Sequence, residues 1–143
     1  MAGFLMETAL PAVARRWASS PCAPFPCGEE VWAYACEVEG IDPPPLPAHE
    51  TRRAMTLLLK EQGGLVNYAD SLMTSLGWQQ VGQPDRGDVG VAALGRMGLT
   101  CAICLDGGYG LDGWPLWMAK GDHEVVTIRA PFRAAWRAPC HKQ

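Results

Sequence analysis

The sequence lacks a long apolar run and a strong charge imbalance, and it contains only three histidines. No stretch approaches the ~20 apolar residues that a helix needs to cross a bilayer, so we expect no membrane span. The formal net charge of −3 argues against general affinity for nucleic acid or acidic lipid. Apolar residues make up 48% of the chain and charged residues 19%, as in ordinary globular proteins. These proportions predict a single domain over residues 1–143.

A secretion signal is also missing. The N-terminus reads Met-Ala-Gly-Phe-Leu-Met-Glu-Thr, without the basic start and the long apolar core of such a signal. We therefore expect synthesis in a cytoplasm, where the six cysteines start out as thiols. Twelve prolines and sixteen glycines indicate many loops and a modest share of regular structure.

Residues 26–38 have the pattern of an amphipathic helix with a cysteine at its start. Apolar residues recur there at three- and four-residue steps, which indicates one buried face. Glu29 and Glu30 suit the positive end of the helix dipole, and Gly40 is expected to end the helix. Cys27 thus lies where unpaired backbone N–H groups and the dipole would favour a thiolate. The alternative interpretation is a small residue near a helix start.

Segments with helical periodicity come first in the chain, and strand patterns follow. This order predicts an α+β fold in which N-terminal helices, within residues 3–77, pack on a C-terminal antiparallel meander, within residues 86–137. Besides the helix at 26–38, we expect helices over residues 3–19, 50–62 and 65–76, strands over residues 88–94, 99–105, 114–120 and 124–128, and a final strand or helix over residues 129–137.

A series of short motifs follows this order: Cys27, Gly40-Ile41-Asp42-Pro43, Gly63-Gly64-Leu65, Arg86-Gly87-Asp88-Val89, Lys120-Gly121-Asp122 and Ala135-Trp136-Arg137. Together with the order of the elements, they resemble the circularly permuted papain-like fold of the NlpC-type cell-wall cysteine peptidases. More closely, they resemble a small family encoded in bacteriophage tail gene clusters. The resemblance covers residues 5–138 and implies an NlpC-like domain.

The resemblance also implies a catalytic site that is incomplete in this chain. In active members the cysteine at the helix start is the nucleophile, and Cys27 occupies that place. The general base is a histidine early in the second strand of the sheet, where this chain has Thr100, which cannot accept a thiol proton near neutral pH. The third, orienting residue would fall near Trp117 or Met118, which are both apolar. We therefore expect no imidazole nitrogen within about 3.5 Å of the Cys27 sulfur.

The function that we favour on this basis is a non-catalytic structural or assembly subunit of a bacteriophage tail tip or baseplate. The resemblance places it in the tail of the virion, assembled in the cytoplasm of a host bacterium. Its partners would be other tail-tip or baseplate proteins, with possible contact to the cell wall and without a cofactor or metal. We expect at least one of Trp114 and Trp117 to be exposed in the isolated domain. The full candidate partner surface consists of large apolar residues in loops: Phe25, Trp114, Leu116, Trp117, Phe132 and Trp136.

Two alternatives stay open. One is an active cysteine hydrolase of peptidoglycan or of a tail protein, in which Cys27 would use His49 or His123 as a substitute base. The other is a small metal-binding module built on Cys101-x-x-Cys104, a spacing found in zinc sites. If residues 99–105 form a strand, these two cysteines point to opposite faces and cannot share a metal. Further ligands of such a module would come from Cys22, Cys27 and Cys140-His141.

Overall fold

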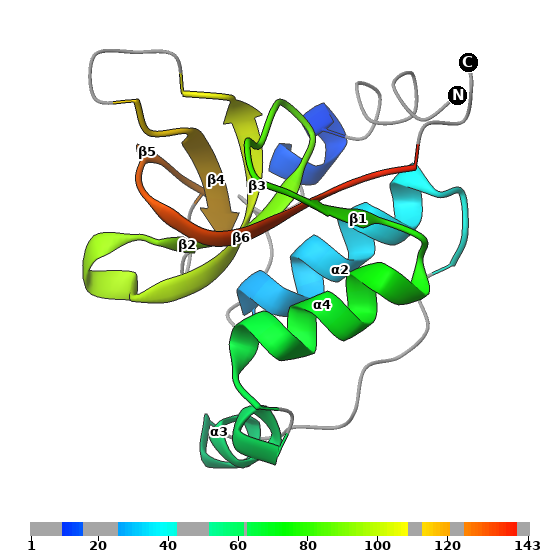
Figure 1. Ribbon diagram of the computed structural model, residues 1–143, viewed down its shortest axis with the longest axis vertical. Helices are drawn as coiled ribbons and strands as arrows, with labels where there is room; N and C mark the ends of the chain where they lie inside the picture. The colour runs from blue at the N-terminus through cyan, green and yellow to red at the C-terminus, as the bar shows by residue number, and fades with distance from the viewer. Residues whose placement is uncertain are drawn as a thin grey trace.

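The computed structural model is a six-stranded antiparallel sheet with helices α2 and α4 packed on one of its faces (Figure 1). The structure describes residues 10–15, 26–42, 52–61, 63–108, 113–120 and 125–139. Helices precede strands along the chain, which confirms the predicted α+β class. A short helical segment covers residues 10–15, and the other helices are α2 (Pro26–Val38), α3 (Arg52–Glu61) and α4 (Leu65–Ser75).

Helix α2 is the central helix of the fold. The apolar stripe expected from the sequence is buried, with Val31, Tyr34 and Val38 exposed by at most 2%. The helix ends at Gly40, whose φ of 73° is a left-handed conformation that favours glycine. The Gly40 N–H donates to the Glu37 carbonyl, and the next N–H donates to the Cys36 carbonyl, as in a Schellman motif.

Four consecutive strands form a meander, and the last strand of the chain lies beside the first strand of that meander. The strand order is β1-β6-β2-β3-β4-β5, so β2 to β5 form the expected meander, whereas β6 crosses back to pair with β2. Residues 129–137 thus contain a strand and no helix. The short strand β1 pairs with β6 in a segment for which the sequence predicted only turns. The strands are β1 (Gln79–Val81), β2 (Val89–Ala93), β3 (Leu99–Asp106), β4 (Leu116–Lys120), β5 (Val125–Arg129) and β6 (Phe132–Arg137).

The middle strands of the sheet are buried on both faces. The face toward the helices carries Cys101 and Ile103 of β3, which join a cluster with the buried side chains of α2 and α4. The opposite face, which we call the second face, carries Ala102 and Cys104 of the same strand. This alternation confirms that the two cysteines of the Cys-x-x-Cys motif point to opposite sides.

Small residues on the second face make room for the Trp117 indole. The Trp117 side chain is 0% exposed, and its Nε1 donates to the Ala130 carbonyl at 3.1 Å. Its ring centroid lies 5.9 Å from that of Phe132. A Cβ atom added at Gly90 would come within 2.4 Å of the indole, so only glycine fits beneath this ring.

We therefore predict that Gly90→Ala destabilises the fold. The added methyl group must displace Trp117 or shift the strand, at a cost of about 1–3 kcal/mol in the free energy of unfolding. Gly82→Ala is the matched control, because a Cβ at Gly82 meets no atom within 4 Å. Urea unfolding followed by circular dichroism measures both variants. Equal midpoints for the two variants would contradict the close packing of Gly90 against the indole.

Candidate functional site

The candidate site lies where α2 packs against β3 and β4. Cys27 falls in the first turn of α2, at the start of a helix, as the sequence predicted. Only the backbone is described there, so the prediction that no imidazole approaches the Cys27 sulfur lies outside the described side chains. His49 and His123 also lie outside the described residues. The site is therefore built from the strands that α2 covers.

Thr100 does not face α2. It pairs with Ala92 of β2, which belongs to the second face, and its hydroxyl donates to the Gly98 carbonyl at 3.1 Å. Because neighbouring side chains on a strand alternate between faces, Thr100 points away from the helix. The assignment of Thr100 to the place of the missing base is therefore wrong. Cys101 occupies the helix-facing position at this end of β3.

The next strand contributes Met118 and Lys120 to the helix-facing side. Met118 belongs to the cluster around α2, whereas Trp117 belongs to the second face. Lys120 lies two residues beyond Met118, on the same face by alternation, and is only 1% exposed. Lys120 is not a histidine, the side chain that serves most often as a general base. The motif Lys120-Gly121-Asp122 marked this residue in the sequence but did not indicate that its side chain would be buried on the helix-facing side.

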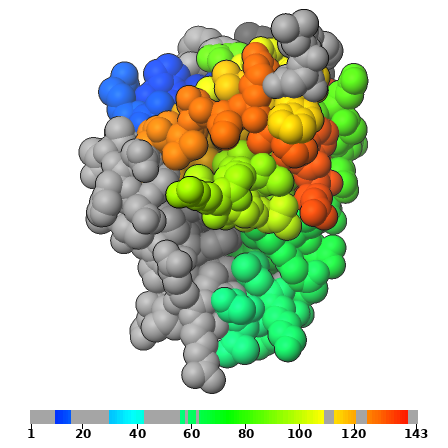
Figure 2. All heavy atoms as spheres, turned by 90° about the vertical axis from the view of Figure 1, so that its left-hand side faces the viewer, coloured from blue at the N-terminus to red at the C-terminus, as the bar shows by residue number. Residues whose placement is uncertain are grey.

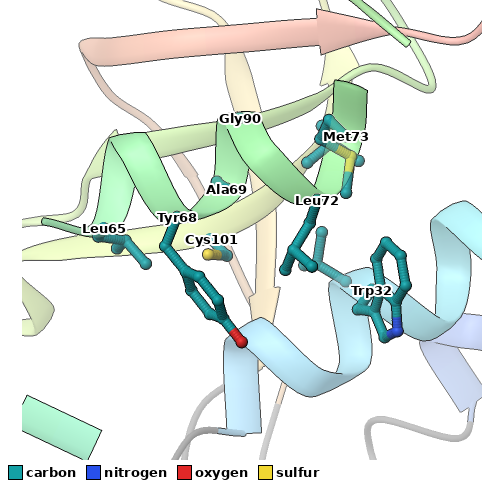
Figure 3. A pocket seen from close by; sticks show the side chains of 10 residues that line it. Trp32, Leu65, Tyr68, Ala69, Leu72, Met73, Gly90 and Cys101 are labelled. Carbon is teal, nitrogen blue, oxygen red and sulfur yellow. The ribbon is translucent and has the colours of Figure 1, made fainter. Parts of the chain in front are cut away.

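A small apolar cavity lies between α2, α4 and the sheet (Figure 3). In the close view, Tyr68 and Leu72 extend from α4 toward α2, near Trp32 and the sulfur of Cys101. The cavity has a volume of about 20 Å³, which is room for about one water molecule. Small-molecule sites commonly measure about 300–1,000 Å³. This cavity is therefore a packing gap and not a substrate pocket.

Cys36, Cys101 and Cys104 are buried, and none of them is part of a disulfide. Burial, assisted by the negative charge of Glu39, raises the pKa of the Cys36 thiol to about 11. Burial likewise raises the pKa of Cys104 to about 12, against a weaker lowering by its hydrogen bond to the Asp106 carbonyl. Buried thiols with raised pKa values are unreactive near neutral pH.

The structure rules out the pair of cysteines on which the metal-binding alternative was based. Cys101 and Cys104 lie on opposite faces of β3, so they cannot bind one ion. Within the described residues, no group of three or more histidine, cysteine or acidic side chains is placed to hold a metal. The further ligands that the sequence offered lie outside the described side chains: Cys22, Cys27, Cys140 and His141.

The Arg-Gly-Asp-Val motif forms a turn that is fixed from three sides. Asp88 is only 4% exposed, and its carboxylate accepts hydrogen bonds from Arg137 of β6 at 2.8 and 3.1 Å and from the Asp85 backbone N–H at 2.8 Å. Burial raises the pKa of the Asp88 carboxyl, and the hydrogen bond from Arg137 opposes this rise. The Tyr34 hydroxyl of α2 donates to the Gly87 carbonyl at 2.7 Å. The motif therefore ties β2, β6 and α2 together.

The candidate partner surface is smaller than predicted. Trp114 is 46% exposed, which confirms that at least one of Trp114 and Trp117 is exposed. Trp117 and Trp136 are each 0% exposed, so their assignment to a partner surface is wrong. The Trp136 Nε1 donates to a carboxylate oxygen of Asp70 at 2.9 Å, a contact between distant segments that satisfies its buried N–H. Leu116 and Phe132 are half-buried, and Phe25 lies outside the described residues.

Comparison with family models, with curated proteins and with solved structures gives no match for this chain. The resemblance to the NlpC-type peptidases therefore stays a prediction. Among the described residues, no helix has the length and apolar character that a membrane crossing requires.

We predict that Asp88→Ala destabilises the protein by about 1–3 kcal/mol, because the Asp85 N–H and the Arg137 guanidinium both lose their acceptor. The matched control is Asp106→Ala, which removes another Asp–Arg pair, with Arg129 at 2.6 Å, but on the exposed surface. This control should leave the unfolding midpoint nearly unchanged. Chemical unfolding at neutral pH measures both variants. Equal losses would show that the Arg-Gly-Asp-Val turn has no special structural role.

The Asp106 pair also has a defined pH dependence. The hydrogen bond from Arg129 lowers the pKa of Asp106, so any stability from this pair is present above the ordinary pKa of a carboxyl group. That contribution is lost as the pH falls through the lowered pKa. The small difference in midpoint that remains between the wild type and Asp106→Ala at neutral pH should therefore disappear in acid.

We also predict that the three buried thiols resist alkylation at pH 7.5 until the protein unfolds. All three thiols are buried, which limits access to them, and the raised pKa values of Cys36 and Cys104 also keep their thiolate fractions low. Timed labelling followed by peptide mass spectrometry, with a urea-unfolded control, measures each site. Labelling of Cys101 at the unfolded rate would contradict its place beneath α2.

Proposed function

We propose that this chain is a non-catalytic structural or assembly subunit of a bacteriophage tail tip or baseplate, with a degenerate NlpC-like fold. The observation that supports this most strongly is the set of side chains on the strand face that α2 covers. They are Cys101 and Ile103 on β3 and Met118 and Lys120 on β4. None of these side chains is a histidine or a carboxylate, the groups that most often accept a proton in general base catalysis.

The remaining parts of the fold agree with a peptidase-like ancestry without its chemistry. A cysteine lies in the first turn of α2, and this helix packs against the antiparallel strands β3 and β4. The Asp88 turn is retained with a full set of hydrogen bonds. This packing and these hydrogen bonds stabilise the fold whether or not a catalytic base is present. A stable fold is what a structural subunit requires.

Trp114 is the described residue best placed to contact a partner. Its backbone carbonyl accepts a hydrogen bond from Arg129 at 3.0 Å, and Arg129 in turn pairs with Asp106. A Cβ added at Gly108 would come within 2.5 Å of the Trp114 backbone, so the two segments pack closely. The indole is therefore exposed on a backbone that is held in place. Rigidly presented tryptophans commonly contribute much of the energy of an interface.

The second candidate function is an active cysteine hydrolase of peptidoglycan or of a tail protein that uses Cys27. Lys120 favours it, because a lysine beneath α2 would help to stabilise a thiolate at the helix start. The pH dependence of Cys27 alkylation separates the two functions. A half-maximal rate near pH 8.5, the ordinary thiol range, fits the structural role, whereas reaction well below that pH supports the hydrolase.

We predict that Trp114→Ala lowers incorporation into phage particles by about tenfold or more, because an interface tryptophan commonly contributes over 1.4 kcal/mol. Its melting temperature should hardly change, since the indole is exposed. Leu57→Ala is the matched control, with a side chain that is 52% exposed on α3. Quantitative mass spectrometry of purified particles measures both variants. Equal incorporation of the two, or unfolding of Trp114→Ala, would contradict the interface.

A further inference from the structure

Strand β5 is an edge of the sheet with its outer side uncovered by any other strand of the described chain. It pairs with β4 on one side, from Leu116 opposite Arg129 to Lys120 opposite Val125. Among the described residues, no strand pairs with the backbone N–H and C=O groups on its outer side. Such an edge is a template for pairing with another chain.

The two edges of the sheet differ in how they are protected. The other edge, β1, is only three residues long, and its Gln79 and Gln80 are polar and exposed. Short, polar edges of this kind resist pairing. In contrast, β5 reads Val-Val-Thr-Ile-Arg, with four β-branched residues in succession and neither proline nor lysine. Strand β5 therefore has the composition of a strand that pairs well on both sides.

Strand β5 carries an exposed apolar side chain. Figure 2 shows β5 in orange on the molecular surface, beside the turn between β2 and β3 in yellow-green. Ile128 of β5 is 41% exposed, and Met97 and Leu99 from that turn and the start of β3 are 40% and 42% exposed. Together with Trp114, they account for most of the exposed large hydrophobic side chains among the described residues.

We propose that β5 pairs antiparallel with β5 of a second copy of this chain, so that two sheets join into one across a two-fold axis. In this pairing the two-fold axis would pass beside Thr127, so that residues equally far from Thr127 on the two strands face one another. In that register each Val126 faces the partner's Ile128, and the two Thr127 side chains face one another. Cross-strand pairs of β-branched residues and Thr–Thr pairs both stabilise antiparallel sheets.

The faces of the strand agree with this register. Val126 pairs with Ala119 and Ile128 with Trp117, and both of these β4 residues belong to the second face. The Val126–Ile128 contacts would therefore extend the second face across the axis. Arg129 would lie opposite the partner's Val125, so no like charges meet. A strand from an unrelated protein would not require this self-complementary pattern, which is why a second copy is the occupant that the sequence favours.

The dimer is independent of the proposed tail function, and the two fail separately. Its first test is the mass of the wild-type chain in solution by light scattering or sedimentation over a range of concentrations. We expect a species of twice the 15.5 kDa mass of one chain. Ile128→Lys should raise the dissociation constant by about tenfold or more, because lysine on an edge strand opposes pairing. Leu57→Lys, a matched change on exposed α3, should leave the dimer unchanged.

The second test fixes the register. Residues that face one another across an antiparallel pair have Cα atoms about 4.5–5.5 Å apart, within the range for a disulfide. Thr127→Cys should therefore form a covalent dimer under mild oxidation. The wild type and Ser71→Cys, with an exposed position on α4, should not. A wild-type chain that is monomeric at every concentration would overturn the proposal and leave β5 to a strand of another protein. A dimer that resists Ile128→Lys and gives no Thr127→Cys link would also overturn it.

Discussion

The burial of β3 on both faces is the constraint on which the rest of the structure depends. One face of the strand, with Cys101 and Ile103, lies beneath α2, and the other, with Ala102 and Cys104, forms the second face with Trp117. A polar group placed at any of these positions would lose its contacts with water and would require a buried partner. The central strand therefore carries small and apolar residues throughout its middle.

The polar interactions of the described chain act mainly to hold elements together. Asp88 binds Arg137 across the sheet, Tyr34 binds the turn beside Asp88, and the Trp136 indole binds Asp70 of α4. Each of these contacts joins segments that are far apart in sequence and satisfies a buried polar group. Polar groups that are fixed in this way stabilise one arrangement of the chain. This is the use of polar residues that a structural role requires.

Much of the fold could be predicted because its signals are local. The amphipathic stripe and terminal glycine specify α2, and alternating or continuously apolar runs specify β2 to β5. Strand β1 was missed because Gln79 and Gln80 carry no apolar pattern, and its pairing with β6 is a long-range contact. The place of β6 beside β2 was missed for a similar reason, because the sequence of a strand does not indicate which other strand it pairs with.

The site was predicted less well, for physical reasons. The resemblance aligned Thr100 with the family's histidine, and a strand that is apolar on both faces gives no clue to which of its residues face the helices. Trp117 and Trp136 were assigned to a partner surface because they were expected in loops rich in large apolar residues. Their burial depends on tertiary contacts, in which the Trp117 N–H donates to the Ala130 carbonyl and the Trp136 N–H donates to Asp70.

The strand face that α2 covers carries no histidine or carboxylate among the described residues, so one measurement tests the proposed role most directly. Purified wild-type protein and Cys27→Ala are each incubated with peptidoglycan and with tail proteins, and newly released amino groups are measured by mass spectrometry. An active cysteine peptidase serves as the positive control. A structural subunit should give no release above background in either sample. Release by the wild type that Cys27→Ala abolishes would contradict the non-catalytic role and establish the chain as a hydrolase.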